Sequence, residues 1–215
     1  MAGMQFRILP VTPFQQNCSL VWCEASRRAA LIDPGGEVER LLAAVAAEGL
    51  TLERILLTHG HLDHVGAAQA IAQRLGVPIE GPQAEDAFWL SRLPEQAALF
   101  GFPPCQAFNP HRWLDDGDEV QIGVEALTVI HCPGHTPGHV VFYSPRHRLA
   151  FVGDVLFRGS IGRTDFPRGD LDSLLTCIRQ RLFALGDDVR VVPGHGPMTS
   201  LGQERLHNPF VADPT

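Results

Sequence analysis

Short apolar segments separated by turn residues dominate the first third of the chain. The segments FRIL, SLVWC, AALIDPGG and RILLTHG are rich in the apolar and β-branched residues that favour strands. A helix is predicted near Glu37 to Glu48, before the last of these segments, so this region predicts a β-α-β unit. Apolar residues at helical spacing in VGAAQAIAQRL, residues 65–75, predict a further helix that ends at Gly76.

The second half of the chain repeats this order. Residues 81–110, rich in proline and phenylalanine, predict a helical insertion with loops. Strand segments resume with EVQI, VEALTVIHCPGH, HVVFYS and RLAFVGD, and a helix near Leu171 to Leu185 precedes a last strand in DVRVVPGHG. We therefore expect one α/β domain over residues 1–215, built from two β-rich layers with helices on their outer faces.

Composition narrows the range of partners. Of the 215 residues, 45% are hydrophobic, which is enough for a sizeable core. The N-terminal residues lack the pattern of an export signal, and no segment approaches the roughly 20 apolar residues of a membrane helix. The net charge is −7 and the 17 Lys and Arg residues are scattered, which is atypical of nucleic-acid binding. A soluble, cytoplasmic protein that binds neither membranes nor nucleic acid is expected.

The cysteines are odd in number, form no C-x-x-C pair and lie mostly in apolar segments: Cys18, Cys23, Cys105, Cys132 and Cys177. We expect reduced thiols, since a cytosolic enzyme rarely carries structural disulfides. Cys132 lies three positions before His135 and precedes a proline, and we expect it to be a packed thiol rather than a metal ligand.

One short stretch concentrates groups that can bind a metal ion. His59, His61, Asp63 and His64 fall within six positions, directly after an apolar segment. Three further candidates, His135, Asp154 and His195, each follow an apolar segment and have glycine beside them. Strand ends hold side chains rigidly, and an adjacent glycine lets the backbone pass close to a bulky ion. The other histidines, His111, His131, His139, His147 and His207, are expected to make ordinary hydrogen bonds.

Five imidazoles and two carboxylates are too many for a single tetrahedral zinc ion. A partition between two ions gives His59, His61 and His135 to the first, gives Asp63, His64 and His195 to the second, and leaves Asp154 as the bridge. Two divalent ions, two carboxylates and one hydroxide leave only a small positive charge. Two Zn²⁺ ions are expected, with Fe or Mn as alternatives.

The H-x-H-x-D-H run with the isolated His135, Asp154 and His195 resembles the metallo-β-lactamase superfamily across nearly the whole chain. The resemblance implies a four-layer αββα sandwich with a dinuclear site at its open edge, and it assigns the bridging role to Asp154. THGHLDHVGAA, HCPGHTPGHVVF, GDVLFRGSIGRTDFPRGD and PGHGPMTSLGQERLHNPF resemble the small bacterial type II glyoxalases, the hydroxyacylglutathione hydrolases. Longer members of that branch carry a C-terminal helical region that grips glutathione, whereas only residues 196–215 follow His195 here.

The expected chemistry is attack of a metal-bridging hydroxide on an acyl carbon. A thiolate, with a pKa of about 8.5, leaves with little help, so a thioester is the least demanding substrate. Asp63 can orient the hydroxide or accept its proton. Arg163 and Arg168 are candidates for binding substrate carboxylates. Arg163 occupies, by resemblance, a position that contacts glutathione in the family. The other interpretation is that these arginines pair with Asp165 and Asp170.

Two other functions stay open. The GRTDF segment, from residue 162, also resembles the persulfide dioxygenases of the same superfamily, which use a single iron held by two histidines and a carboxylate. An all-N/O site does not exclude iron. A non-catalytic metal-binding scaffold is the second alternative, and it would require a closed coordination shell.

Overall fold

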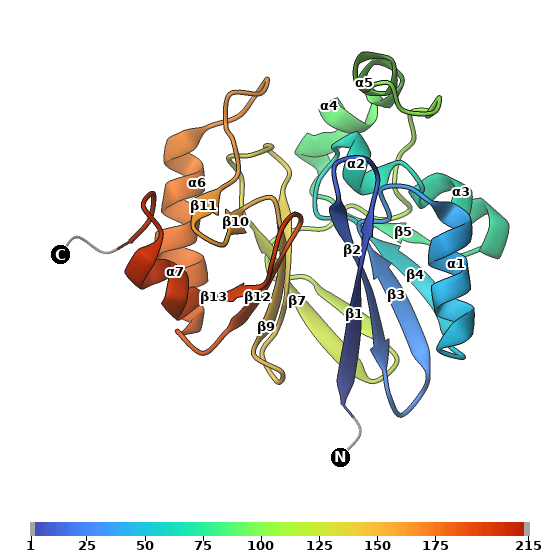
Figure 1. Ribbon diagram of the computed structural model, residues 1–215, viewed down its shortest axis with the longest axis horizontal. Helices are drawn as coiled ribbons and strands as arrows, with labels where there is room; N and C mark the ends of the chain where they lie inside the picture. The colour runs from blue at the N-terminus through green and yellow to red at the C-terminus, as the bar shows by residue number, and fades with distance from the viewer. Residues whose placement is uncertain (1–2, 213–215) are drawn as a thin grey trace.

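Two β-sheets lie face to face with helices on both outer sides in a computed structural model that describes residues 3–212 (Figure 1). This is the αββα layering expected from the sequence. Helices α1 (Val38–Ala47) and α3 (Ala68–Leu75) cover one sheet, and α6 (Leu171–Cys177) and α7 (Leu201–His207) cover the other. Within residues 3–212, no helix has the length and apolar character needed to cross a membrane.

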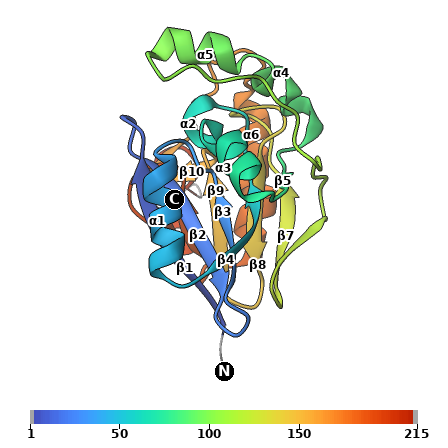
Figure 2. The ribbon, with the colours of Figure 1, turned by 90° about the vertical axis from the view of Figure 1, so that its right-hand side faces the viewer.

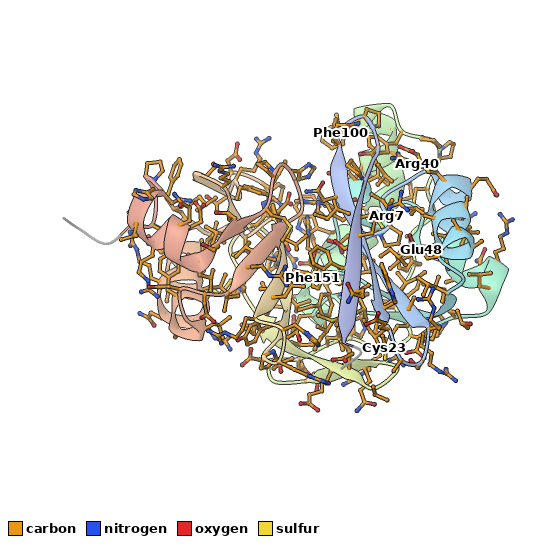
Figure 3. All side chains as sticks on the ribbon, turned by 60° about the horizontal axis from the view of Figure 1, so that its bottom comes forward. Arg7, Cys23, Arg40, Glu48, Phe100 and Phe151 are labelled. Carbon is orange, nitrogen blue, oxygen red and sulfur yellow. A yellow bond between two sulfur atoms is a disulfide. The ribbon has the colours of Figure 1, made fainter. Side chains whose placement is uncertain are left out.

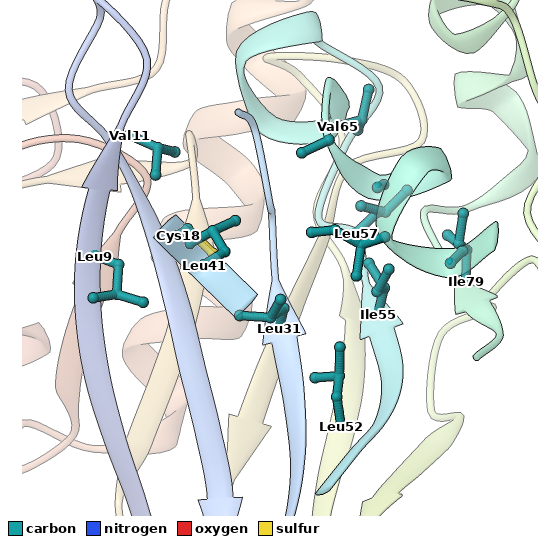
Figure 4. Close-up of a cluster of buried hydrophobic side chains, with 14 of the residues drawn as sticks. Leu9, Val11, Cys18, Leu31, Leu41, Leu52, Ile55, Leu57, Val65 and Ile79 are labelled. Atoms are coloured by element: carbon teal, nitrogen blue, oxygen red, sulfur yellow. The ribbon is translucent and has the colours of Figure 1, made fainter. Parts of the chain in front are cut away.

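The first sheet combines an antiparallel meander with parallel strands. Its strands in spatial order are β1 (Met4–Val11), β2 (Gln16–Cys23), β3 (Arg28–Ile32), β4 (Thr51–Leu56) and β5 (Ile79–Glu80). Strand β4 runs parallel to β3 because α1 (Val38–Ala47) returns the chain across the sheet. The apolar faces of α1 and α3 (Ala68–Leu75) bury Leu41, Val45 and Ile71 against this sheet. Figure 4 shows Leu41 in the same buried cluster as Leu31 and Ile55 of the sheet.

The second sheet is built from the other half of the chain. Its strands in spatial order are β13 (Thr199–Ser200), β12 (Arg190–Pro193), β9 (Leu149–Gly153), β8 (Val140–Ser144), β7 (Glu125–His131) and β6 (Glu119–Ile122). Only β12 and β9 are parallel. The helix expected near 171–185 is α6 (Leu171–Cys177), extended by a π-helical turn (Ile178–Leu182) and a 3₁₀ turn (Phe183–Leu185), and α7 (Leu201–His207) follows β13.

The inner faces of the two sheets form the central core. Phe142 and Phe151 are its largest side chains, and Val21, Ile32 and Leu56 face them from the first sheet. Figure 3 shows Phe151 between the two halves of the molecule, where its ring contacts Phe6 edge-on with centroids 5.8 Å apart. This core fixes how the loops of one sheet lie against those of the other.

The helical insertion expected over residues 81–110 is confirmed. It contains a 3₁₀ turn (Ala84–Asp86), α4 (Ala87–Leu90) and α5 (Leu93–Phe100). In Figure 2, α4 and α5 lie at the top, at the end of the molecule opposite the N-terminus. The short hairpin of β10 (Leu156–Phe157) and β11 (Ser160–Ile161) follows β9.

Two expectations are wrong in detail. The helix expected over 65–75 begins only at Ala68, and a separate helical turn, α2 (Leu62–Val65), precedes it and carries Asp63 and His64. The expectation that all five cysteines are reduced, with Cys132 a packed thiol, is also wrong: Cys132 forms a disulfide with Cys177. These residues are 45 positions apart, but packing of α6 against the chain that leaves β7 brings their Cα atoms to 5.5 Å.

Truncation of Phe142 tests the central core. The side chain is fully buried between the sheets, so Phe142→Ala should lower the free energy of unfolding by about 3–5 kcal/mol, measured by urea denaturation. Val124→Ala is the control, because Val124 is 73% exposed, and it should change stability by no more than about 0.5 kcal/mol. Equal losses in the two variants would contradict the assignment of the core.

Candidate metal centre

The seven residues expected to bind metal meet at one edge of the sandwich. His59 and His61 lie in the loop after β4, Asp63 and His64 lie on α2, and His135 lies in the loop between β7 and β8. Asp154 directly follows β9, and His195 follows β12. Each residue thus comes from the end of a strand or from the turn next to one.

Three imidazoles form a first cluster, His59, His61 and His135. The Nδ1 atom of His61 lies 3.1 Å from Nε2 of His59 and 3.0 Å from Nε2 of His135. Burial lowers the pKa of all three imidazoles. They are therefore neutral near pH 7, the form in which a histidine nitrogen offers a lone pair to a metal ion.

A second cluster consists of Asp63, His64 and His195. Asp63 Oδ2 lies 3.2 Å from Nε2 of His195 and 3.7 Å from Nε2 of His64. Burial acts to lower the pKa of His64, but the carboxylates of Asp154 and Asp63 outweigh burial and raise it. The excess of carboxylate charge at this cluster therefore favours a bound cation.

Asp154 lies between the two clusters. Its Oδ1 atom is 3.4 Å from Nε2 of His64, and its Oδ2 atom is 3.6 Å from Nε2 of both His135 and His195. Burial alone would raise the pKa of Asp154, but the adjacent imidazoles of His64, His135 and His195 hold it well below its usual range. An ionised carboxylate in contact with both clusters suits the bridging position.

The arrangement fits metal ions better than it fits hydrogen bonds alone. His64 Nε2 and Asp154 Oδ1 are buried and have no hydrogen-bond partner. The backbone also makes room for them, because a Cβ atom on Gly194 would lie 2.2 Å from Asp154 Oδ1 and 2.7 Å from Cε1 of His64. Imidazole nitrogens and carboxylate oxygens are ligands for zinc, iron and manganese.

Asp33, which the sequence analysis did not single out, orients two of these histidines. Its buried carboxylate accepts hydrogen bonds from the Thr58 backbone N–H at 2.7 Å, from Thr58 Oγ1 at 2.5 Å and from His64 Nδ1 at 2.9 Å. Thr58 Oγ1 in turn lies 3.0 Å from Nδ1 of His59. These contacts leave the Nε2 lone pairs of both rings facing the clusters. Asp33 directly follows the buried strand β3 and precedes two glycines, much as Asp154 directly follows β9. This sequence context could have identified Asp33 as a residue of the site.

Three of the other histidines make the ordinary hydrogen bonds expected of them. His131 and His147 bond to Pro137 O and Glu125 at 2.8 Å, and His111 accepts from the Ile79 N–H at 3.0 Å. His139 is closer to the centre than expected: it stacks on His59, with centroids 4.7 Å apart, and its Nε2 accepts from the Asp154 N–H at 3.1 Å. It supports the ligands without belonging to either cluster.

A cavity of about 550 Å³ opens onto both clusters. Aromatic side chains form much of its wall: Phe14, Trp89, Phe100, Phe102, Phe157 and Phe166. Arg163 also lines it, with its guanidinium bonded through two nitrogens to Asp165 and placed over the Phe166 ring.

Arg168 stacks on Phe88 at 4.1 Å and is not among the lining residues. Asp170 caps α6 through the Ser173 N–H instead of pairing with Arg168.

The C-terminal segment holds one wall of this cavity. Glu204 is buried and accepts hydrogen bonds from the Gly159 N–H and from Asn208 Nδ2, both at 2.8 Å. Asn208 donates to Ser160 O at 2.9 Å. The β10–β11 hairpin, which contributes Phe157 and Ser160 to the cavity, is therefore tied to α7.

Comparison with known proteins places these features in a family. The family model described as the metallo-beta-lactamase superfamily matches residues 11–195. The chain is 50% identical over 209 residues to hydroxyacylglutathione hydrolase GloC of Haemophilus influenzae, covering 97% of this chain and 98% of that protein.

Solved structures agree on the fold. The crystal structure of BLEG-1 B3 metallo-beta-lactamase has a TM-score of 0.89 and 36% identity, covering 97% of this chain and 100% of the other. That of TTHA1623 in a di-iron-bound form has a TM-score of 0.87 and 40% identity, covering 95% and 100%. ETHE1 from Myxococcus xanthus has a TM-score of 0.79 and 31% identity, covering 97% and 84%.

Replacing Asp33 tests its control of ligand orientation. Asp33→Asn puts an amide against the donors of His64 and Thr58, so it should weaken metal binding about 10- to 100-fold, measured by competition with a chromophoric chelator. Asp172→Asn, at an exposed position on α6, is the control and should bind metal like the parent protein. Unchanged affinity in a folded Asp33→Asn protein would contradict the orienting role.

Proposed function

Because the chain belongs to the metallo-beta-lactamase superfamily, we propose that this metallo-hydrolase cleaves thioesters of glutathione, with S-lactoylglutathione or a related hydroxyacylglutathione as substrate. The observation that carries the proposal is the pair of ligand clusters joined by Asp154 at the floor of an open cavity. The 50% identity to a hydroxyacylglutathione hydrolase supports the choice of substrate.

We propose that the centre holds two divalent ions. One ion would be bound by His59, His61 and His135, and the other by Asp63, His64 and His195. Asp154 would bind both ions. Zn²⁺ is the proposed metal, with Fe or Mn as alternatives, and the di-iron form of TTHA1623 keeps iron in consideration. Such ions, when bound, lower the pKa of a shared water to about 7 and polarise a carbonyl. The buried imidazoles contribute neutral donors, and Asp154 contributes a bridging negative charge.

Asp63 is proposed as the catalytic carboxylate. It lines the cavity and retains some solvent exposure, so it can reach a nucleophile held between the clusters. Its second role is to orient the hydroxide or accept its proton as the acyl carbon is attacked. Covalent catalysis is the weaker alternative, because the sequence contains no G-x-S-x-G nucleophile motif.

The charged groups on the cavity wall favour a thiolate leaving group. Among the described residues that line it, the ionisable ones are Arg163 and five residues of the two clusters and their bridge. No separate acid stands ready to protonate an amine or alkoxide. A thiolate needs no such proton near pH 7, since its pKa is about 8.5.

Arg163 and Arg168 are proposed to bind the carboxylates of glutathione. Arg163 lies on the cavity wall, and its present partner Asp165 is exposed, so a substrate carboxylate can compete for the same two guanidinium nitrogens. Arg168 is exposed beside Phe88 and can reach only the outer part of a bound peptide.

We also propose that the protein acts in the cytoplasm on a small molecule, without a nucleic-acid or membrane partner. The scattered cations and the acidic net charge support this. The Cys132–Cys177 disulfide is evidence against a reducing compartment, because structural disulfides are rare in the cytosol.

Hydrolysis of S-lactoylglutathione by protein of known metal content tests the proposal. We expect a kcat/KM of at least about 10⁴ M⁻¹s⁻¹, abolished in His61→Ala because that change removes a nitrogen from the first cluster. Asp172→Asn should retain activity. Negligible turnover by the fully metallated parent protein would exclude glutathione thioesters as substrates.

Arg163→Ala tests carboxylate recognition. Loss of the guanidinium should raise KM for a glutathione thioester about 10-fold or more, because a charge-assisted bidentate contact is lost, while KM for a neutral thioester should change little. Steady-state kinetics on both substrates measures the difference. Equal effects on the two substrates would refute the role of Arg163.

The persulfide dioxygenase function is the second candidate. The GRTDF segment, which resembles that of the persulfide dioxygenases, favours it. Metal analysis together with oxygen uptake on glutathione persulfide separates the two functions: the hydrolase should consume no oxygen, whereas one iron per chain with oxygen consumption would identify a dioxygenase. A non-catalytic scaffold is disfavoured, because the cavity leaves both clusters open to a small molecule.

A further inference from the structure

Asp86 lies inside the helical insertion, a segment to which the sequence analysis assigned no chemistry. Its carboxylate is fully buried, and it is not a member of either ligand cluster. It precedes α4, at the point where the insertion meets two of the loops that carry the first histidine cluster.

Asp86 accepts hydrogen bonds from both of these loops. Oδ2 accepts from the backbone N–H of Gly60 at 2.7 Å and from Oγ1 of Thr136 at 2.8 Å. Oδ1 accepts from the backbone N–H of Gly138 at 2.6 Å. Gly60 lies between His59 and His61, and Thr136 follows His135, so one carboxylate connects the loops that supply all three imidazoles.

Close backbone packing accompanies these bonds. A Cβ atom on Gly60 would lie 2.7 Å from Cβ of Trp89, and one on Gly138 would lie 2.5 Å from the Asp86 N atom. The Gln83 N–H also donates to Gly138 O at 2.9 Å. The two loops thus rest directly on the segment from Gln83 to Trp89, with no room for them to shift toward it.

Burial makes the ionised form of the Asp86 carboxylate unfavourable. Burial raises the pKa of Asp86 to about 6, against the effect of its three hydrogen bonds, and no cationic side chain in the described chain pairs with it. An ionised carboxylate is an acceptor at both oxygens, which matches three donors. An asparagine could accept at one atom only and would turn an N–H donor toward a donor.

We propose that Asp86 is a positioning residue that sets the distance between the His59–His61 loop and the His135 loop, and thereby the affinity of the three-histidine cluster for its metal ion. Side chains that orient metal ligands change metal affinity by about 10- to 100-fold when replaced. The inference rests on the proposed metal centre, but it does not depend on the substrate.

Zinc titration against a chromophoric chelator tests this role without reference to activity. Asp86→Asn should weaken one of the two zinc equivalents about 10- to 100-fold and leave the other within about 3-fold. Glu85→Gln removes the same charge one position earlier, at an exposed side chain, and should bind both equivalents normally. In a His195→Ala background, which lacks a ligand of the second cluster, Asp86→Asn should still weaken the remaining equivalent.

Thr136→Val provides an independent variant if Asp86→Asn fails to fold. It removes one of the three donors while it preserves the side-chain shape, and it should weaken the same equivalent several-fold. Normal affinity for both equivalents in the folded variants, or an equal loss at both, would overturn the inference. If the parent protein itself bound no zinc, both the proposed metal centre and the role of Asp86 would be overturned.

Discussion

The candidate metal centre depends on the convergence of lone pairs where the two sheets meet. Three buried neutral imidazoles direct nitrogens toward one another at 3.0–3.1 Å, and an ionised carboxylate lies between them and a second cluster. Such groups are costly to desolvate unless something shared satisfies them. The central core fixes the sheets, the sheets fix the strand ends, and the strand ends supply the ligands.

Carboxylates behind the ligands complete the centre. Asp33 reaches His64 directly and His59 through Thr58, whereas Asp86 reaches only the backbone and hydroxyl of the loops that carry His59, His61 and His135. One therefore fixes the rotation of the rings and the other the spacing of the loops. Glu204 ties the β10–β11 hairpin, which contributes Phe157 and Ser160 to the cavity, to α7. Asp33, Asp86 and Glu204 are all buried, and none of them is among the residues that line the cavity.

Local patterns were sufficient to predict the layers and the residues that cluster at the candidate site. Periodicity identified the strands and outer helices. The dense run from His59 to His64 identified four of the seven residues that the structure brings together, and glycine-flanked strand ends identified His135, Asp154 and His195. Tertiary contacts carried the rest. The sequence around Cys132 does not indicate that α6 packs beside it. In sequence, Asp86 is an ordinary acidic residue at the start of a helix, and only the folded structure shows that Gly60 and Gly138 lie against it.

The most direct test of a dinuclear centre is a crystal structure of the zinc-loaded protein with anomalous scattering recorded at the zinc edge. We expect two peaks per chain: one among His59, His61 and His135, the other among Asp63, His64 and His195, with Asp154 in contact with both. A single peak at full metal loading, bound by two histidines and one carboxylate, would contradict the dinuclear centre.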